Sequence, residues 1–116
     1  MRKLYIVKTN KDFENIIING TCLKNRYYII HHIPNNLPYD RFGISVSKKL
    51  GNSVFRNKYK RKIRSIIDNY KKHYNNKEDY IIILRKEAIN KSYDLLEKEM
   101  FSLLNEKKKG TNDEKK

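Results

Sequence analysis

The chain has 116 residues, a length that suits one domain with a single hydrophobic core. Hydrophobic residues make up 38% of the sequence, and no apolar run approaches the ~20 residues that cross a bilayer, which excludes a wholly disordered chain and a membrane-spanning one. With 27 Lys and Arg against 13 Asp and Glu, the net charge of +14 favours a polyanionic partner, nucleic acid first and an acidic membrane surface second.

The first predicted element is a short helix that begins at Thr9 or Asn10, since both residues can cap a helix N-terminus. Its apolar residues Phe13, Ile16 and Ile17 follow the i, i+3, i+4 spacing of a single helical face. The spacing therefore predicts a short helix with one apolar face.

Three segments predict β-strands. Residues 26–33 and 79–85 are rich in β-branched and aromatic side chains, and the continuous apolar run of 79–85 indicates a central, well-buried strand. Residues 41–47 alternate between apolar and small or polar side chains, which indicates a strand with one buried face. The proline-containing loop 34–40 is expected to join strands 26–33 and 41–47 as an antiparallel pair. The pattern also leaves room for an additional strand in the N-terminal half.

The region from Asn52 to Tyr74 predicts a long helix with an apolar stripe that would cover the sheet. Residues 48–72 contain ten basic residues and one acid, so this segment has a net charge of +9. Solvated helix faces usually mix both signs at i, i+4, because like charges at that spacing repel by a few tenths of a kcal/mol. Here Arg56, Lys60 and Arg64 follow one another at that spacing, which favours nucleic-acid binding over a solvated face. A membrane-surface helix is disfavoured, because the sheet needs the apolar stripe.

A further helix is predicted from Ser92 to about Lys107, with an apolar stripe at i, i+4, i+7 and i+8. The order of helix, two strands, long helix, strand and helix predicts an α+β fold, a sandwich of a sheet and helices. We expect a single RNA-binding domain over residues 1–108, followed by a disordered basic tail over residues 109–116. The stripe of the last helix consists of Leu96, Met100, Leu103 and Leu104.

Residues 41–67 read RFGISVSKKLGNSVFRNKYKRKIRSII. This run resembles the family of bacterial ribonuclease P protein subunits, whose pattern is Gly-Ile/Leu-Ser-Val-Ser-Lys-Lys, then Gly-Asn-Ala-Val, Arg-Asn-Arg, Lys-Arg and a further Arg. The third residue of the Arg-Asn-Arg motif is Lys58 here, which keeps the charge but loses the planar guanidinium. The matching residues are Gly43, Ser45, Val46, Ser47, Lys48, Lys49, Gly51, Asn52, Val54, Arg56, Asn57, Lys60, Arg61 and Arg64.

The resemblance implies an α/β sandwich similar to a fold found in ribosomal proteins, with a mainly antiparallel sheet and a left-handed β-α-β crossover that general rules would not predict. It implies that the basic helix binds the catalytic RNA and that a cleft between the first helix and the sheet holds the single-stranded 5′ leader of precursor tRNA. The family usually has an aromatic residue at the position of Ile17 and a tyrosine at that of His31. The expected RNA-binding residues are Lys48, Lys49, Asn52, Arg56, Asn57, Lys58, Lys60, Arg61 and Arg64. The expected leader-cleft residues are Phe13, Ile17, Tyr28, His31, Ser45 and Ser47.

The resemblance also implies that the RNA subunit, with Mg²⁺ that it mainly holds itself, hydrolyses the phosphodiester bond while the protein promotes endonucleolytic removal of the leader. The residues agree, since the acids are scattered and the adjacent His31 and His32 would point to opposite faces of a strand. We therefore expect no catalytic residue in this chain, and its metal ligands, if any, are not predicted. The alternative function is a structural ribosomal-RNA-binding protein of similar fold.

Cys22 is the single cysteine, so an internal disulfide is excluded. The sequence shows no signal peptide, and we expect a cytoplasmic protein. The expected partners are the catalytic RNA and precursor tRNA, with no membrane and no obligatory protein partner.

Overall fold

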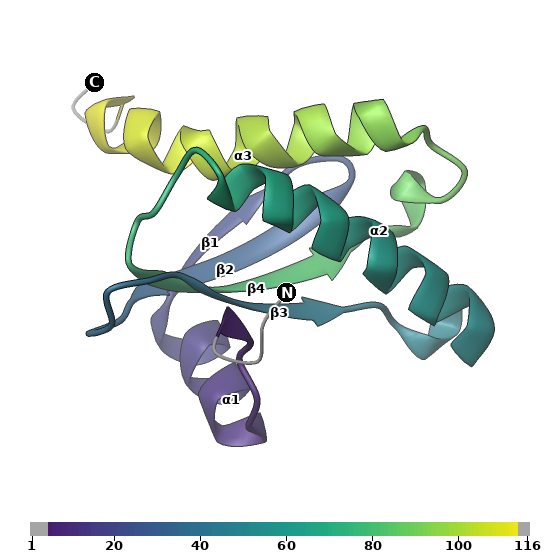
Figure 1. Ribbon diagram of the computed structural model, residues 1–116, viewed down its shortest axis with the longest axis horizontal. Helices are drawn as coiled ribbons and strands as arrows, with labels where there is room; N and C mark the ends of the chain where they lie inside the picture. The colour runs from purple at the N-terminus through teal and green to yellow at the C-terminus, as the bar shows by residue number, and fades with distance from the viewer. Residues whose placement is uncertain (1–4, 114–116) are drawn as a thin grey trace.

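The computed structural model describes residues 5–113, with side chains as far as Glu106. A four-stranded sheet forms the middle layer, α2 and α3 cover one of its faces, and α1 lies against the other (Figure 1). This arrangement confirms the predicted α+β sandwich. The elements are α1 (Asn10–Asn19), β1 (Thr21–Lys24), β2 (Tyr28–Pro34), β3 (Arg41–Ser45), α2 (Ser53–Lys71), β4 (Glu78–Leu84) and α3 (Tyr93–Asp113).

The strand order is β1-β2-β4-β3, so β4 is a central strand as predicted. β2 pairs with β4 in antiparallel fashion, and β3 pairs with it in parallel, beginning with Arg41 opposite Asp79. The predicted pair between β2 and β3 is wrong, because β4 lies between them. β4 is apolar on both faces, with Tyr80 and Ile81 both fully buried on opposite sides, and only a central position covers both.

The additional strand that the sequence left open is β1, which pairs with β2 in antiparallel fashion at one edge of the sheet. The turn between the two strands is held by Asn25, whose side-chain oxygen accepts from the backbone N–H groups of Tyr27 and Tyr28, both at 2.9 Å. β1 has only four residues and is mostly exposed, which is why its apolar signal is weak.

The larger core lies between the sheet and the two helices α2 and α3. The predicted stripe of α2 is confirmed, since Tyr59, Ile63, Ile66, Ile67 and Tyr70 are buried there. The predicted stripe of α3 is likewise buried. α3 extends beyond its predicted end near Lys107, and residues 114–116 of the predicted tail lie outside the described part of the chain.

The smaller core lies between the sheet and α1, where Ile16 packs with Val7 and Ile81. The N-cap of α1 is Thr9, whose hydroxyl accepts from the backbone N–H of Asp12 at 3.0 Å. Ile17 belongs to the apolar face of the predicted helix and was expected in the leader cleft, and it is 44% exposed. The helix therefore covers only part of this face of the sheet, and Ile17 lies at the border of the uncovered part.

β3, α2 and β4 form a β-α-β unit whose two strands are parallel neighbours. α2 crosses over the face of the sheet that carries the larger core (Figure 1). This crossover brings the N-terminus of α2 next to the end of β3. The left-handedness that the resemblance implied for this unit stays a prediction.

Candidate nucleic-acid interface

The segment between β3 and α2 presents two consecutive basic residues and then the start of the long helix. Lys48 and Lys49 lie in a 3₁₀ turn whose N-cap is Ser47, with the Ser47 hydroxyl accepting from the Lys49 N–H at 3.1 Å. Asn52 caps α2, and its side-chain oxygen accepts from the N–H of Phe55 at 3.0 Å. These two caps hold the start of α2 in a fixed geometry and leave both lysines exposed.

The residues predicted to bind RNA lie together on this turn and the first half of α2. Arg56 and Lys60 are half-buried, and the guanidinium Nε of Arg56 donates to the carbonyl of Gly51 at 3.3 Å. Within residues 5–106, no ion pair neutralises any of the basic members of this group. We call this surface the basic surface; it consists of Lys48, Lys49, Asn52, Arg56, Asn57, Lys58, Lys60, Arg61 and Arg64, and seven of the nine residues are exposed.

The lack of acidic partners determines what the basic surface can bind. Unneutralised cations at one-turn spacing repel each other, and a polyanion that approaches them relieves this repulsion and releases its counterions. Arginine side chains contact phosphate through two N–H groups, and the lysines contact it as point charges. The geometry therefore suits a phosphate backbone better than a single small anion.

A hollow connects the basic surface to the α1 side of the sheet. Lys60 and Arg64 line one wall of this hollow, whose volume is about 130 Å³, and Phe13 of α1 lines another wall. The hollow lies at the outer edge of β3, where Gly43 and Ile44 belong to its lining. The basic surface and Phe13 of α1 therefore border the same hollow.

Phe13 lies on the sheet at Gly43. A Cβ atom at Gly43 would approach the Phe13 ring to 2.6 Å and the Ile81 side chain to 3.0 Å, so a larger residue would displace the ring. Phe13 is half-buried, and it therefore belongs partly to the smaller core and partly to the surface. Ile17 follows one helical turn later with its side chain 44% exposed.

The sheet face beside these α1 residues carries His31 and Ser45, both half-buried. Successive side chains of a strand point to opposite faces, so His31 shares a face with Ile29 of β2 and with Ile83 of β4. Both isoleucines are half-buried, and the prediction missed them. Their signal was ambiguous, because β2 and β4 have apolar residues on both faces. We call the surface formed by Phe13, Ile17, Ile29, His31, Ser45 and Ile83 the cleft face.

Two predicted leader residues lie elsewhere. Tyr28 is fully buried on the opposite face of the sheet, where its hydroxyl donates to the carbonyl of Leu96 at 2.9 Å and burial raises its pKa above the usual range. Its assignment to the cleft is corrected, because it is a core residue that anchors α3. Ser47 is exposed and lies next to Lys48 of the basic surface.

The two adjacent histidines point to opposite faces of β2, as the sequence predicted. Burial lowers the pKa of His31 from its ordinary value of 6.5, and the charge of His32 acts in the same direction. His32 lies toward the larger core, where its Nδ1 is 2.6 Å from the carboxylate of Glu78. In the described part of the chain, no three His, Cys, Asp or Glu side chains gather closely enough to hold a metal ion.

No helix in residues 5–113 combines the length and the apolar character that crossing a bilayer requires. A family model described as Ribonuclease P matches residues 1–108. The chain belongs to the ribonuclease P protein family. A ribonuclease P protein component of Streptococcus pneumoniae is 40% identical over 104 residues, covering 90% of this chain and 85% of that relative.

Solved structures of ribonuclease P proteins share the fold. A Staphylococcus aureus RNase P protein, described as a mutant with defective mRNA degradation activity, superimposes with a TM-score of 0.84 at 36% identity, covering 91% of this chain and 90% of that one. The Thermotoga maritima RNase P protein gives a TM-score of 0.81 at 28% identity, covering 86% of this chain and 94% of that one. As a ribonuclease P protein component, the chain is an RNA-binding subunit of a ribonucleoprotein in tRNA 5′-end maturation. This membership decides against a structural ribosomal-RNA-binding protein.

Proposed function

We propose that the basic surface binds the catalytic RNA of ribonuclease P and that the cleft face holds the single-stranded 5′ leader of precursor tRNA. One observation supports this proposal: Lys60 and Arg64 of the basic surface and Phe13 of the cleft face line the same hollow. Single-stranded nucleic acid is bound by cations that follow its backbone and by aromatic or apolar side chains that contact its bases. The basic surface supplies the cations, and Phe13, Ile17 and His31 supply the base contacts.

In this proposal, the RNA subunit carries out the hydrolysis of the phosphodiester bond. Mg²⁺ prefers carboxylate and phosphate oxygens, and the described residues gather no three metal-ligating side chains at either surface. We therefore assign no Mg²⁺ site among the described residues and propose that the RNA mainly holds the Mg²⁺. The chain contributes affinity and orientation of the substrate, and we place it in the cytoplasm, where it needs no obligatory protein partner.

Reconstitution tests this proposal. The purified chain is added to a bacterial catalytic ribonuclease P RNA, and cleavage of precursor tRNA is measured at low Mg²⁺ concentration. We expect faster cleavage and tighter substrate binding than with the RNA alone, because the basic surface neutralises phosphates that Mg²⁺ would otherwise screen. The controls are the RNA alone and the chain alone, and an unchanged rate on addition of the chain would refute the proposal.

A further inference from the structure

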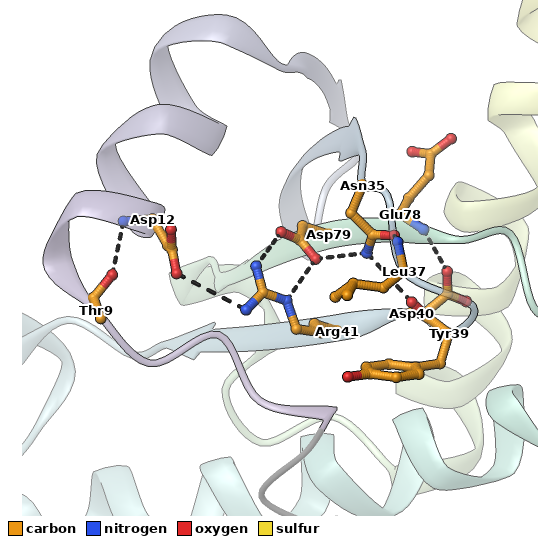
Figure 2. A network of polar contacts seen from close by, with 9 residues as sticks. All are labelled: Thr9, Asp12, Asn35, Leu37, Tyr39, Asp40, Arg41, Glu78 and Asp79. Atoms are coloured by element: carbon orange, nitrogen blue, oxygen red, sulfur yellow. Dashed lines mark hydrogen bonds and ion pairs between the residues drawn. The ribbon is translucent and has the colours of Figure 1, made fainter.

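A series of polar contacts lies at the base of α1, where β3 and β4 begin (Figure 2). Arg41 and Asp79 are register partners on these strands. The guanidinium of Arg41 donates to both carboxylate oxygens of Asp79, from Nε at 2.9 Å and from Nη2 at 2.6 Å. This two-bond geometry is the strongest arrangement of such a pair, and Asp79 is only 6% exposed. The third guanidinium nitrogen, Nη1, lies 3.9 Å from a carboxylate oxygen of Asp12 in the first turn of α1.

The loop before β3 holds this ion pair from another direction. The side-chain amide of Asn35 donates to Asp79 at 2.8 Å and to the carbonyl of Tyr39 at 3.3 Å. The preceding carboxylate, Asp40, is only 2% exposed and accepts from the backbone N–H of Glu78 at 2.8 Å. The Arg41 guanidinium is therefore a fixed point of the sheet, because both its own strand and its partner are restrained.

α1 makes few polar contacts with the sheet. Between α1 and the sheet, the pair Asp12–Arg41 is the only ion pair or side-chain hydrogen bond among residues 5–106. The remaining contacts are apolar, through Phe13 and Ile16. This packing limits the rotation of α1 about its own axis, and the Asp12–Arg41 pair adds a polar contact at the first turn of the helix. A rotation of α1 would move Phe13 and Ile17 across the cleft face.

We propose that Asp12 is a positioning residue for leader binding. Its contact with Arg41 sets the rotation of α1, and through it the place of Phe13, the next residue in the chain. Asp12 lines a hollow of about 360 Å³ on the Arg41 side of α1, which Phe13 does not line, so Asp12 acts on the leader through the helix. The inference rests on the proposed function, because it assumes that the cleft face binds the leader.

The opposite effect would follow if Asp12 acted on RNA only through its negative charge. Removing a carboxylate near a polyanion strengthens binding to every substrate, whether or not it has a leader. A positioning role predicts weaker binding, and only of substrates whose leader reaches the cleft face. The sign of the change and its dependence on the leader therefore separate the two roles.

The test uses the reconstituted complex of the chain and the catalytic RNA. Two precursor tRNAs that differ only in having a leader of several nucleotides or of one nucleotide are compared by their Kd. In Asp12→Asn, we expect the affinity advantage of the long leader to fall about two- to fivefold, the range for a partly exposed ion pair. Asp12→Glu keeps the charge with a longer side chain and should retain the advantage. Glu14→Gln removes a charge from an exposed position of α1 with no partner at Arg41, and should also retain it.

A second measurement on the free protein keeps the result independent of substrate. In nuclear magnetic resonance spectra, the contact between the Phe13 ring and Gly43 should weaken in Asp12→Asn and persist in Glu14→Gln. An unchanged contact, or a leader advantage that is unchanged or raised in Asp12→Asn, would overturn the positioning role. A wild-type complex with equal affinity for both substrates would instead overturn the proposed leader binding, while the Phe13–Gly43 contact would still decide whether Asp12 positions α1.

Discussion

His31 and His32 are neighbours in β2 but have different surroundings. His32 contacts Glu78 at 2.6 Å, whereas the Nδ1 atom of His31 is buried and has no hydrogen-bond partner among the described residues. Burial lowers the pKa of His31, which favours the neutral form of its ring. A neutral ring at this position adds no positive charge to the cleft face.

The lowered pKa of His31 predicts a loss of stability in acid. The unfolded chain binds this proton at about pH 6.5, and the folded protein binds it only at lower pH. The free energy of unfolding therefore decreases as the pH falls below 6.5, until the folded protein is protonated as well. Urea unfolding at pH 7.5 and pH 5 should show a smaller decrease in His31→Gln than in the wild type. The exposed His73 provides the control, and an equal decrease in His31→Gln and His73→Gln would contradict the assignment.

The arginines of the basic surface should determine how steeply RNA binding depends on salt concentration. In Arg56→Ala combined with Arg61→Ala, affinity for the catalytic RNA should fall, and the slope of log K against log salt should become shallower by about one unit per lost phosphate contact. Filter binding at several salt concentrations measures this slope. Lys98→Ala, at an exposed position of α3, provides a control that should leave it unchanged. A slope that the double variant does not alter would mean that these arginines face solvent in the complex.

At the scale of elements, α2 combines two faces with separate tasks. Ile63 is fully buried against the sheet, while Arg61 is exposed two positions earlier. Ile63→Ala should lower the free energy of unfolding by about 2–4 kcal/mol, since it removes a buried side chain and leaves a cavity. Provided that measurements stay below the unfolding temperature, the salt slope of RNA binding should not change. Arg61→Ala should give the reverse pattern, and a variant that changed both properties alike would refute the separation.

The helices and β4 were predictable because their signals are local. The stripe of α2 has a clear period, and the apolar run of β4 needs cover on both faces wherever it lies. Which strands pair is not a local property, and the short loop between β2 and β3 suggested a hairpin that β4 in fact separates. Tyr28 was assigned to the wrong face for a related reason. The run YYII is apolar at every position, so its pattern does not show which side chains point to which face of the sheet.

At the scale of the whole molecule, a net charge of +14 destabilises the folded state by self-repulsion. Anions that bind the basic surface should therefore raise the melting temperature. We expect phosphate to raise Tm by several degrees relative to chloride at equal ionic strength, since about 1 kcal/mol of binding corresponds to roughly 4 °C in a domain of this size. Differential scanning calorimetry measures the shift. The shift should shrink in Arg56→Ala with Arg61→Ala, and equal shifts in that variant and the wild type would place the bound anions elsewhere.

The candidate site could be predicted only in part, because its two halves differ in how they are encoded. The basic surface lies within one continuous segment of sequence, so charge and spacing were sufficient to locate it. The cleft face combines α1, β2, β3 and β4, and its isoleucines at positions 29 and 83 come together only through strand pairing. The hollow that joins the two surfaces depends on this assembly as well.

The central position of β4 also determines when the protein can fold during its synthesis. In the sheet, β2 and β3 are joined only through β4, which begins at Glu78 and follows α2 in the chain. Until then the nascent chain carries a strongly basic helix without the sheet that orders it, beside the ribosomal RNA. The sheet can therefore close only after β4 has been made, and only then does the basic helix have the sheet to pack against.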